Sequence, residues 1–215
     1  MEQKPTIIAI DGPAASGKGS LARKLATHFG FDYLDTGTLY RRVALKVLES
    51  KTDPNDQESV ISCAKSLNPD EKYDDSALRG DNVGSTASIV AQIQPVRDIL
   101  VNYQRNFAKN ALKGAILDGR DIGTVICPDA DVKFFITASV EIRAERRHKE
   151  LQSRGIPSTY ATVLAEMRER DGRDSGRISA HLNSSRSDVH HIDTSDKTPQ
   201  SVLDAAIEIV QSQLS

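Results

Sequence analysis

The sequence predicts an α/β fold in which a parallel sheet is covered by helices on both faces. Apolar runs of strand length alternate with amphipathic runs of helix length along most of the chain. The strand-length runs are almost continuously apolar, which is typical of strands buried on both sides. Strands that alternate with helices are joined by crossover connections, so we expect a parallel sheet.

Five strands are expected, because five short apolar runs are bounded by polar residues or glycine: residues 6–10, 31–34, 114–119, 132–137 and 189–193. The accompanying helices are expected at residues 17–29, 38–49, 141–153 and 201–213. In the first of these helices, Leu21, Leu25 and Phe29 recur at the spacing of one helical face.

Two segments interrupt this alternation. Residues 50–83 are polar and rich in Asp, Asn and Ser, so we expect an inserted subdomain or an excursion over the surface. Residues 154–187 contain Gly, Pro and alternating Arg and Asp. This second segment has too little apolar content to form core, and we expect a mobile cover or a solvated pair of helices there.

The composition limits the class of protein. A chain of 215 residues suits one domain, with or without an insertion. Its formal net charge of −2 argues against a basic nucleic-acid binder, and no apolar run approaches the length of a membrane-spanning helix. Cys63 and Cys127 are too few for a disulfide framework or a zinc site. We therefore expect a cytoplasmic monomer with reduced cysteines and without nucleic-acid or membrane partners.

The stretch DGPAASGKGS (11–20) follows the first strand and opens the first helix. Gly12 and Gly17-Lys18 match the phosphate-loop pattern, but position 19 is glycine and the hydroxyl comes one place later, at Ser20. Glycines let consecutive N–H groups point inward, and the helix adds the positive end of its dipole. Lys18 supplies a mobile charge for terminal phosphates, and Ser20 supplies a hydroxyl that can reach Mg²⁺. This context favours phosphate binding over a plain glycine-rich turn.

Further charged residues follow other predicted strands. Arg41, in LDTGTLYR (34–41), would lie in the first turns of the second helix and can hold a phosphate with its two-pronged donor face. Arg120 and Asp121, in ILDGRDIGTV (116–125), follow a buried strand. Because ligands in open α/β sheets bind outside the carboxyl ends of the strands, we expect this pair at the same rim as Lys18.

Taken together, GPAASGKGS, LDTGTLYR, STASIVAQIQPVRDIL (85–100), LDGRDIGTV and RERDGRDSGR (168–177) resemble the bacterial-type cytidylate kinases. These are nucleoside monophosphate kinases of the P-loop class, and Gly19 fits their version of the loop. The resemblance runs from about residue 6 to the last helix. It implies transfer of the γ-phosphoryl group of ATP to CMP or dCMP, giving CDP or dCDP and ADP, with Mg²⁺.

The resemblance also implies a division of the chain and a set of site residues. The five-stranded P-loop core would comprise about 1–36, 112–153 and 188–215, with a CMP-binding insertion at about 37–111 and an Arg-rich lid at about 154–187. The residues expected to bind ATP phosphates are Gly12, Pro13, Ala14, Ala15, Ser16, Gly17, Lys18, Gly19 and Ser20, with Ser20 also toward the metal.

The acceptor site is expected from four further segments. Its phosphate end would comprise Thr36, Tyr40, Arg41 and Arg120. Ser88 and Arg97 match the groups that read the cytosine edge, and Asp121 matches a residue of the same pocket. From the lid, the resemblance brings the sugar-facing pair Arg170 and Asp174, the base-facing Arg177, and Arg173 toward a phosphate.

The chemistry accounts for this many cations. The attacking group is a phosphate oxygen that is already largely ionised, so no strong general base is required, and positioning and charge stabilisation carry the rate. Lys18, Arg120 and Arg173 are the residues expected to act in catalysis, and one such arginine is worth about 10³-fold or more. The lid would exclude water from the reacting groups.

One departure and three alternatives stay open. The segment SAHLNSSRSDVHHID (179–193) lacks the Ala-Pro-Leu that the family often shows, which bears on the geometry of the lid. A kinase for UMP or AMP would share the core and differ at about 84–100 and in the lid. A regulatory GTPase would need an Asn-Lys-x-Asp guanine reader, which the sequence lacks. An ATP-binding module without turnover would be expected to lack Lys18, Arg41 or Arg120.

Overall fold

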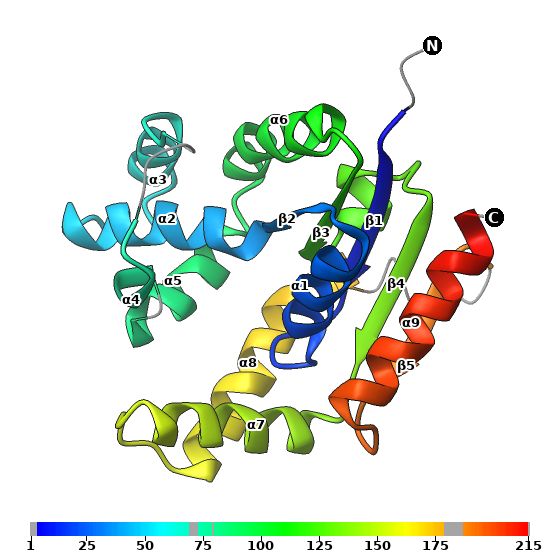
Figure 1. Cartoon of the computed structure of the whole chain (residues 1–215). Helices are drawn as coiled ribbons and strands as arrows, with labels where there is room; N and C mark the ends of the chain where they lie inside the picture. The colour runs from blue at the N-terminus through cyan, green and yellow to red at the C-terminus, as the bar shows by residue number, and fades with distance from the viewer. Residues whose placement is uncertain (1–3, 69–72, 79, 179–186, 215) are drawn as a thin grey trace.

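The structure, a computed structural model, describes residues 4–68, 73–78, 80–178 and 187–214. Five parallel strands form one sheet in the order β2-β3-β1-β4-β5 (Figure 1). They are β1 (Thr6–Asp11), β2 (Asp32–Asp35), β3 (Gly114–Gly119), β4 (Val132–Thr137) and β5 (His190–Asp193). The predicted five-stranded parallel sheet is confirmed.

The helices are α1 (Lys18–Phe29), α2 (Thr36–Glu49), α3 (Gln57–Lys65), α4 (Asp75–Leu78), α5 (Asp81–Val90), α6 (Gln94–Asn110), α7 (Val140–Ser153), α8 (Tyr160–Ile178) and α9 (Pro199–Leu214). A π-helical turn, η1 (Ile122–Ile126), follows β3. In the part of the chain that the structure covers, no helix is both long and apolar enough to cross a membrane.

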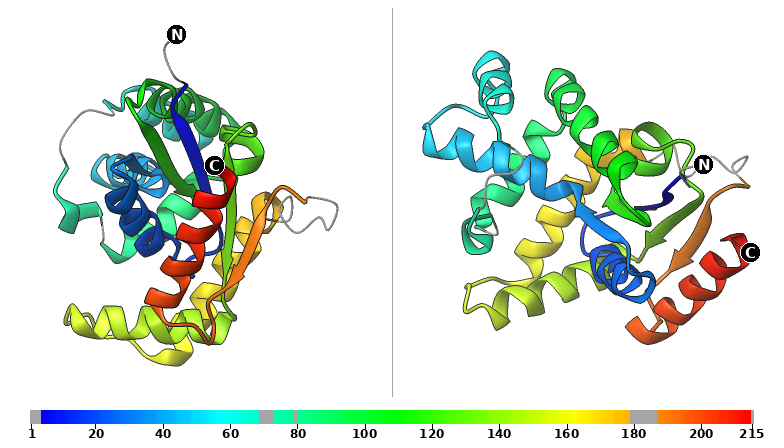
Figure 2. Two further views of the ribbon diagram at one scale, coloured as in Figure 1. Left: turned by 45° about the vertical axis from the view of Figure 1, so that its right-hand side comes forward. Right: turned by 45° about the horizontal axis from the view of Figure 1, so that its top comes forward.

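The sheet is buried on both faces. Side chains alternate across a strand, so Ile8 and Ile10 of β1 face one side and Ala9 faces the other. Ile8 and Ile10 belong to a core with α1 and α9, whereas Ala9 belongs to a core with α6 and η1. Figure 2 shows α1 and α9 lying along the sheet on one face. The register pairs Asp35 with Asp118 and Asp11 with Gly119, so the carboxyl ends of β1, β2 and β3 form one rim.

A second apolar cluster lies among the helices α2, α3, α5 and α6. Leu39, Val43 and Val47 of α2 meet Val60 of α3 and Leu100 of α6 there. The segment expected as a polar insertion or surface excursion therefore contains a packed helix, α3, which buries Val60 and Ala64 at its spacing of four residues.

Helix α8 corrects the expectation that residues 154–187 form a mobile cover or a solvated pair of helices. Residues 154–178 form a turn and a single helix, and α8 buries Val163 and Met167 against α7 and the loop after β1. The low apolar content is sufficient because these residues are four apart and share one helical face. The described part of this segment is therefore a packed helix. The departure at residues 179–186 lies outside the described residues.

Candidate functional site

The loop between β1 and α1 turns sharply and lies against β4. A Cβ atom at Gly12 would stand 2.0 Å from the carbonyl oxygen of Ile136, so only glycine fits there. Ala15 and Gly17 adopt left-handed backbone angles, with φ of 58° and 91°. Such alternation of backbone conformations forms a concave arrangement of N–H groups, which suits an anion at the start of α1.

Lys18 stands on the first turn of α1, facing two acids at the rim of the sheet. Its Nζ donates to the carbonyl oxygen of Pro13 at 3.5 Å. Burial and the nearby Arg120 guanidinium lower the pKa of Lys18 to about 8. Asp118, buried at the end of β3, has its pKa raised to about 7 by burial and by Asp35 on the neighbouring strand, although Lys18 opposes this shift. The amine of Lys18 and the carboxyl groups of Asp118 and Asp35 thus influence one another's charge at this rim.

Gly19 is required by the approach of Asp118. A Cβ atom at Gly19 would stand 3.0 Å from Oδ2 of Asp118, a contact that few real side chains make. A serine or threonine here, as in the general phosphate-loop pattern, would press on this carboxylate. The hydroxyl instead lies one residue later, at the exposed Ser20.

The carboxylate oxygens of Asp118 and the hydroxyl of Ser20 are candidate ligands for a metal ion that binds with a nucleotide. Among the described residues, Oδ1 of Asp118 is buried and has no hydrogen-bond partner. Carboxylate and hydroxyl oxygens are ligands that Mg²⁺ accepts, and this ion usually takes its remaining ligands from phosphates and water. Over the described ranges, no cluster of three or more His, Cys, Asp or Glu side chains could hold a metal ion. Asp118 and Ser20 therefore fit a metal that arrives with phosphates rather than one caged by protein.

The phosphate loop and the predicted acceptor residues line one cavity of about 330 Å³. The cavity lies at the carboxyl ends of β2 and β3 and reaches α2, α5 and α8. The predicted residues that line it are Ala14, Ala15, Lys18, Gly19, Thr36, Tyr40, Arg41, Ser88, Arg120, Asp121, Arg170 and Asp174.

Arg120 and Asp121 are fixed by a buried carboxylate beneath them. Asp11, at the end of β1, accepts the N–H groups of Ile122 and Gly123 at 2.8 Å each. These are the first residues of η1, so Asp11 joins β1 to the turn that follows Arg120 and Asp121. Pairing a buried carboxylate with two backbone donors satisfies all three groups.

The predicted binding groups hold one another across the site. Nε of Arg120 donates to Asp174 of α8 at 2.8 Å, and Nη2 of Arg97 donates to Asp121 at 2.5 Å. Arg173 donates to the hydroxyl of Ser88 at 3.0 Å and also pairs with Glu169. These contacts link α5, α6, α8 and the turn after β3 to one another.

Several predicted residues lie outside the main cavity or support its wall. Arg97 and Arg173 line an adjoining cavity of about 290 Å³, which Asp121 also lines. Thr36 is buried and its hydroxyl donates to the carbonyl oxygen of Asp118 at 2.7 Å, so it holds the end of β3 in place. The side chain of Arg177 lies outside the described residues. The loop residues that do not line the cavity are Gly12, Pro13, Ser16, Gly17 and Ser20.

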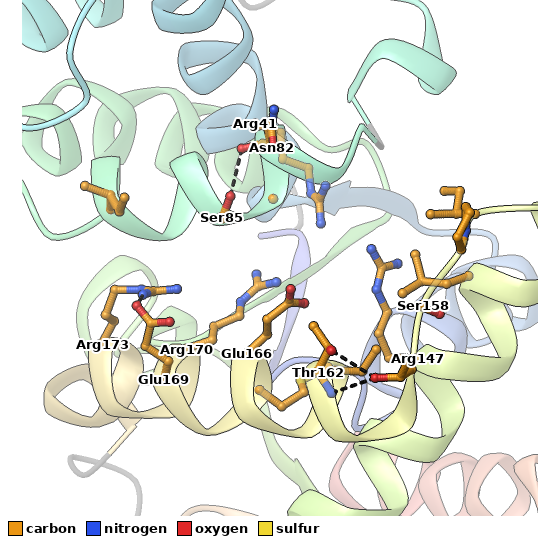
Figure 3. Close-up of a pocket in the computed structure, with 18 residues that line it drawn as sticks. Arg41, Asn82, Ser85, Arg147, Ser158, Thr162, Glu166, Glu169, Arg170 and Arg173 are labelled. Carbon is orange, nitrogen blue, oxygen red and sulfur yellow. Dashed lines mark hydrogen bonds and ion pairs between the residues drawn. The ribbon is translucent and has the colours of Figure 1, made fainter.

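A larger cavity of about 860 Å³ opens between α5 and the helices α7 and α8. It shares Arg41, Arg147, Met167 and Arg170 with the smaller cavity, so the two are continuous. Figure 3 shows Arg147 and Arg170 pointing from below toward Arg41 on the opposite wall. Burial and the nearby Arg120 lower the pKa of Arg170 to about 9.

Four residues of the site and its surroundings were not predicted from the sequence: Asp35, Asp118 and Arg147, which line the cavity, and Arg143, which donates to the phosphate loop at Ala14. Asp35 and Asp118 end β2 and β3, and the strand-end rule that indicated Arg120 would have indicated them too. Arg147 lines both cavities and lies one helical turn beyond Arg143 on α7. Nothing in the local pattern of α7 distinguishes these two arginines from its exposed cations.

Comparisons with known proteins show which family the chain belongs to. A family model for cytidylate kinase matches residues 8–212. A cytidylate kinase of Paramagnetospirillum magneticum is 52% identical over 210 residues, which cover 97% of this chain and 99% of the relative. One from Rhodospirillum rubrum is 50% identical over 207 residues, or 95% of this chain and 96% of the relative.

Solved structures show the same fold at low identity. An uncharacterized protein from Eubacterium ventriosum has a TM-score of 0.57 at 18% identity, covering 97% of this chain and 99% of that chain. Thymidylate kinase from Candida albicans has a TM-score of 0.50 at 14% identity, with 97% and 92% covered. Because the family model and both close relatives span nearly the whole sequence, the chain belongs to the cytidylate kinase family.

Proposed function

We propose that this protein transfers the γ-phosphoryl group of ATP to CMP or dCMP, giving CDP or dCDP and ADP. The observation that carries the proposal is the single cavity where Lys18 of the phosphate loop meets Arg41, Arg120 and Arg170. A donor loop with no acceptor site would need no cations facing it from α2, from the turn after β3 and from α8.

In the proposed mechanism, residues 12–20 hold the ATP phosphates through backbone N–H groups and Lys18. Arg41 and Arg120 hold the acceptor phosphate, and Arg120 with Lys18 balances charge on the transferring group. Arg173 enters the catalytic set by exchanging Glu169 or Ser88 for a phosphate oxygen. No side chain needs to act as a strong base, because the acceptor oxygen is already largely ionised.

The remaining roles follow the same proposal. Mg²⁺ bound with ATP would be held by Ser20 and Asp118 and would neutralise charge on the phosphates. Thr36 and Tyr40 would shape the phosphate end of the acceptor site. Ser88, Arg97 and Asp121 would read the base with Arg177, and Arg170 with Asp174 would face the sugar. 

We also propose a functional division of the chain. The core would comprise about 1–36, 112–153 and 188–215, the CMP-binding insertion about 37–111, and the lid about 154–187. The helix α8 supports the last of these assignments, because it carries Arg170, Arg173 and Asp174 over the cavity. We further propose that the protein works in the cytoplasm as a monomer, without nucleic-acid or membrane partners.

The test is ADP release from Mg-ATP in the presence of CMP, dCMP, UMP, AMP or GMP in turn. CMP and dCMP should be turned over well ahead of the others. Equal or higher turnover with UMP or AMP would contradict the cytidylate assignment, and ATP hydrolysis indifferent to every monophosphate would contradict kinase activity.

Replacing Arg97 tests how the base is read. Arg97→Ala should lower kcat/KM for CMP by about 10-fold to 100-fold, because it removes the guanidinium that donates to Asp121 and is proposed to donate to the base edge. The preference for CMP over UMP should shrink with it. Lys109→Ala removes an exposed cation of the same helix and should change neither value. An intact CMP preference in Arg97→Ala would show that this arginine does not read the base.

A further inference from the structure

Arg143 joins three separate segments around the phosphate loop. This arginine of α7 is almost fully buried, at 5% exposure. Its Nε donates to the carbonyl oxygen of Ala138 at 2.9 Å, and its Nη1 donates to that of Ala14 in the phosphate loop at 3.3 Å. Nη1 and Nη2 also hold both carboxylate oxygens of Asp171 on α8, at 2.9 Å and 2.6 Å.

Apolar contacts reinforce this junction. Ala14 packs in one cluster with Ala144 and Leu151 of α7 and with Val163 and Met167 of α8. Val163, Met167 and Asp171 are four residues apart, so the packed face of α8 continues directly into the ion pair. The phosphate loop is therefore attached to α8 through apolar packing and through one charged bidentate contact.

Asp171 lies among the residues of α8 that reach the cavity. Arg170 precedes it and Asp174 lies one turn beyond it, and both line the cavity with Lys18. Arg173, on the same turn, reaches Ser88 of α5. Because Arg143 holds both Asp171 and the carbonyl oxygen of Ala14, it fixes the rotation of α8 about its own axis relative to the phosphate loop. That rotation determines where the charged side chains of α8 point. A two-pronged arginine contact is suited to this because it restricts both distance and orientation.

We propose that Arg143 and Asp171 are positioning residues that couple the phosphate loop to α8. The inference rests on the proposed function and deepens it. When the donor nucleotide orders the loop at Ala14 and Ala15, the Arg143–Asp171 contact transmits that order to α8. The arginines of α8 are then placed for transfer before the acceptor is bound. Neither residue touches the reacting atoms.

Asp171→Asn tests the coupling, because it removes the charge while keeping the size of the side chain. We expect kcat to fall about 10-fold to 100-fold at saturating ATP and CMP, as loss of alignment does, while KM for CMP changes less than about threefold. CMP-independent ATP hydrolysis should rise relative to transfer. Asp171→Glu, which keeps the carboxylate, should recover part of kcat.

A matched control is available between the same two helices. Arg168 of α8 pairs with Glu141 of α7 at 3.3 Å, and both side chains are more than half exposed, at 62% and 55%. Glu141→Gln should leave kcat and both KM values unchanged. An equal loss in Glu141→Gln and Asp171→Asn, or full kcat in Asp171→Asn, would overturn the proposal.

Amide hydrogen exchange distinguishes a loss of coupling between the phosphate loop and α8 from a general loss of stability. In the wild-type protein, a non-hydrolysable ATP analogue without CMP should slow amide exchange along residues 160–178. This protection should be lost in Asp171→Asn and kept in Glu141→Gln. If Asp171→Asn does not fold, Arg143→Lys replaces it, since lysine keeps the charge but cannot make the fork. Protection of α8 that is the same in the variant and the wild type would overturn the proposal. The wild-type assay with CMP tests the proposed function separately.

Discussion

Gly19 couples the geometry of the phosphate loop to the sheet beneath it. Its missing side chain lets the Asp118 carboxylate lie 3.0 Å from the place of a Cβ atom. The neighbouring Asp35 and the ammonium of Lys18 act on the same carboxylate. The space left by the missing side chain of Gly19 thus determines how closely the Asp118 carboxylate can approach α1.

Gly19→Ala should separate activity from stability. Alanine favours a helix over glycine by about 1 kcal/mol, and this gain offsets part of the strain against Asp118. We therefore expect the free energy of unfolding to change by less than about 1 kcal/mol, while kcat/KM for ATP falls about tenfold because the carboxylate is displaced. Gly172→Ala in α8, with no atom within 4 Å of its new methyl group, should raise stability and leave kcat/KM unchanged. Full ATP activity in Gly19→Ala would contradict this role of Gly19.

The lowered pKa of Lys18, about 8, predicts a pH dependence. The free enzyme loses this charge as the pH rises through about 8, so kcat/KM for ATP should fall on the alkaline side. Bound phosphates favour the ammonium, so kcat at saturating ATP should stay level over the same range. The measurement is a kinetic series between about pH 6 and pH 10 with both parameters resolved. A kcat/KM that stays flat to about pH 10 would show that Lys18 keeps its proton in the free enzyme.

At the scale of elements, β1 and η1 act as one unit because of Asp11. This fully buried carboxylate accepts two backbone N–H groups of the turn that carries Arg120 and Asp121 at its start. Strand β1 thereby positions Arg120 and Asp121, although no side chain of β1 lines the cavity.

Asp11→Asn should weaken both the fold and the site. Its amide group places a donor against backbone donors, so we expect the free energy of unfolding to fall by about 1–3 kcal/mol and kcat to fall with it. Asp131→Asn is the matched control, because Asp131 also accepts a backbone N–H of β1, that of Ile7 at 2.8 Å, but at the exposed opposite end. It should leave kcat unchanged. Equal kinetic effects of the two variants would show that Asp11 acts through general stability alone.

The helices differ in how well the sequence predicts them. Helix α1 was predicted within one residue, because its apolar face and its loop are both local signals. The packing of α3 and α8 was not predicted. Among the side chains that the structure describes, each has two buried apolar residues on one face, and whether such a face is covered depends on segments far away in the chain. The Arg143–Asp171 contact spans 28 residues for the same reason.

For the whole molecule, the strands were predictable and their order was not. All five predicted strands match the structure within about one residue at each end. The three inner strands β1, β3 and β4 are apolar and largely buried, as expected for a sheet covered on both faces, whereas the edge strands β2 and β5 are more exposed. The order β2-β3-β1-β4-β5 depends on which crossover packs on which face, and sequence length alone does not determine this. The motifs still located the site, because parallel strands bring their carboxyl ends to one rim.

Basic and acidic side chains are equally numerous around the cavity. Its lining holds five basic side chains and five acidic ones: Lys18, Arg41, Arg120, Arg147 and Arg170 against Asp35, Asp118, Asp121, Glu150 and Asp174. A chloride or a single phosphate ion brings too little charge to release several of these partners together. A nucleotide pair brings enough, and reaches them from two directions. We therefore expect common small anions to compete only weakly with the nucleotides for this cavity.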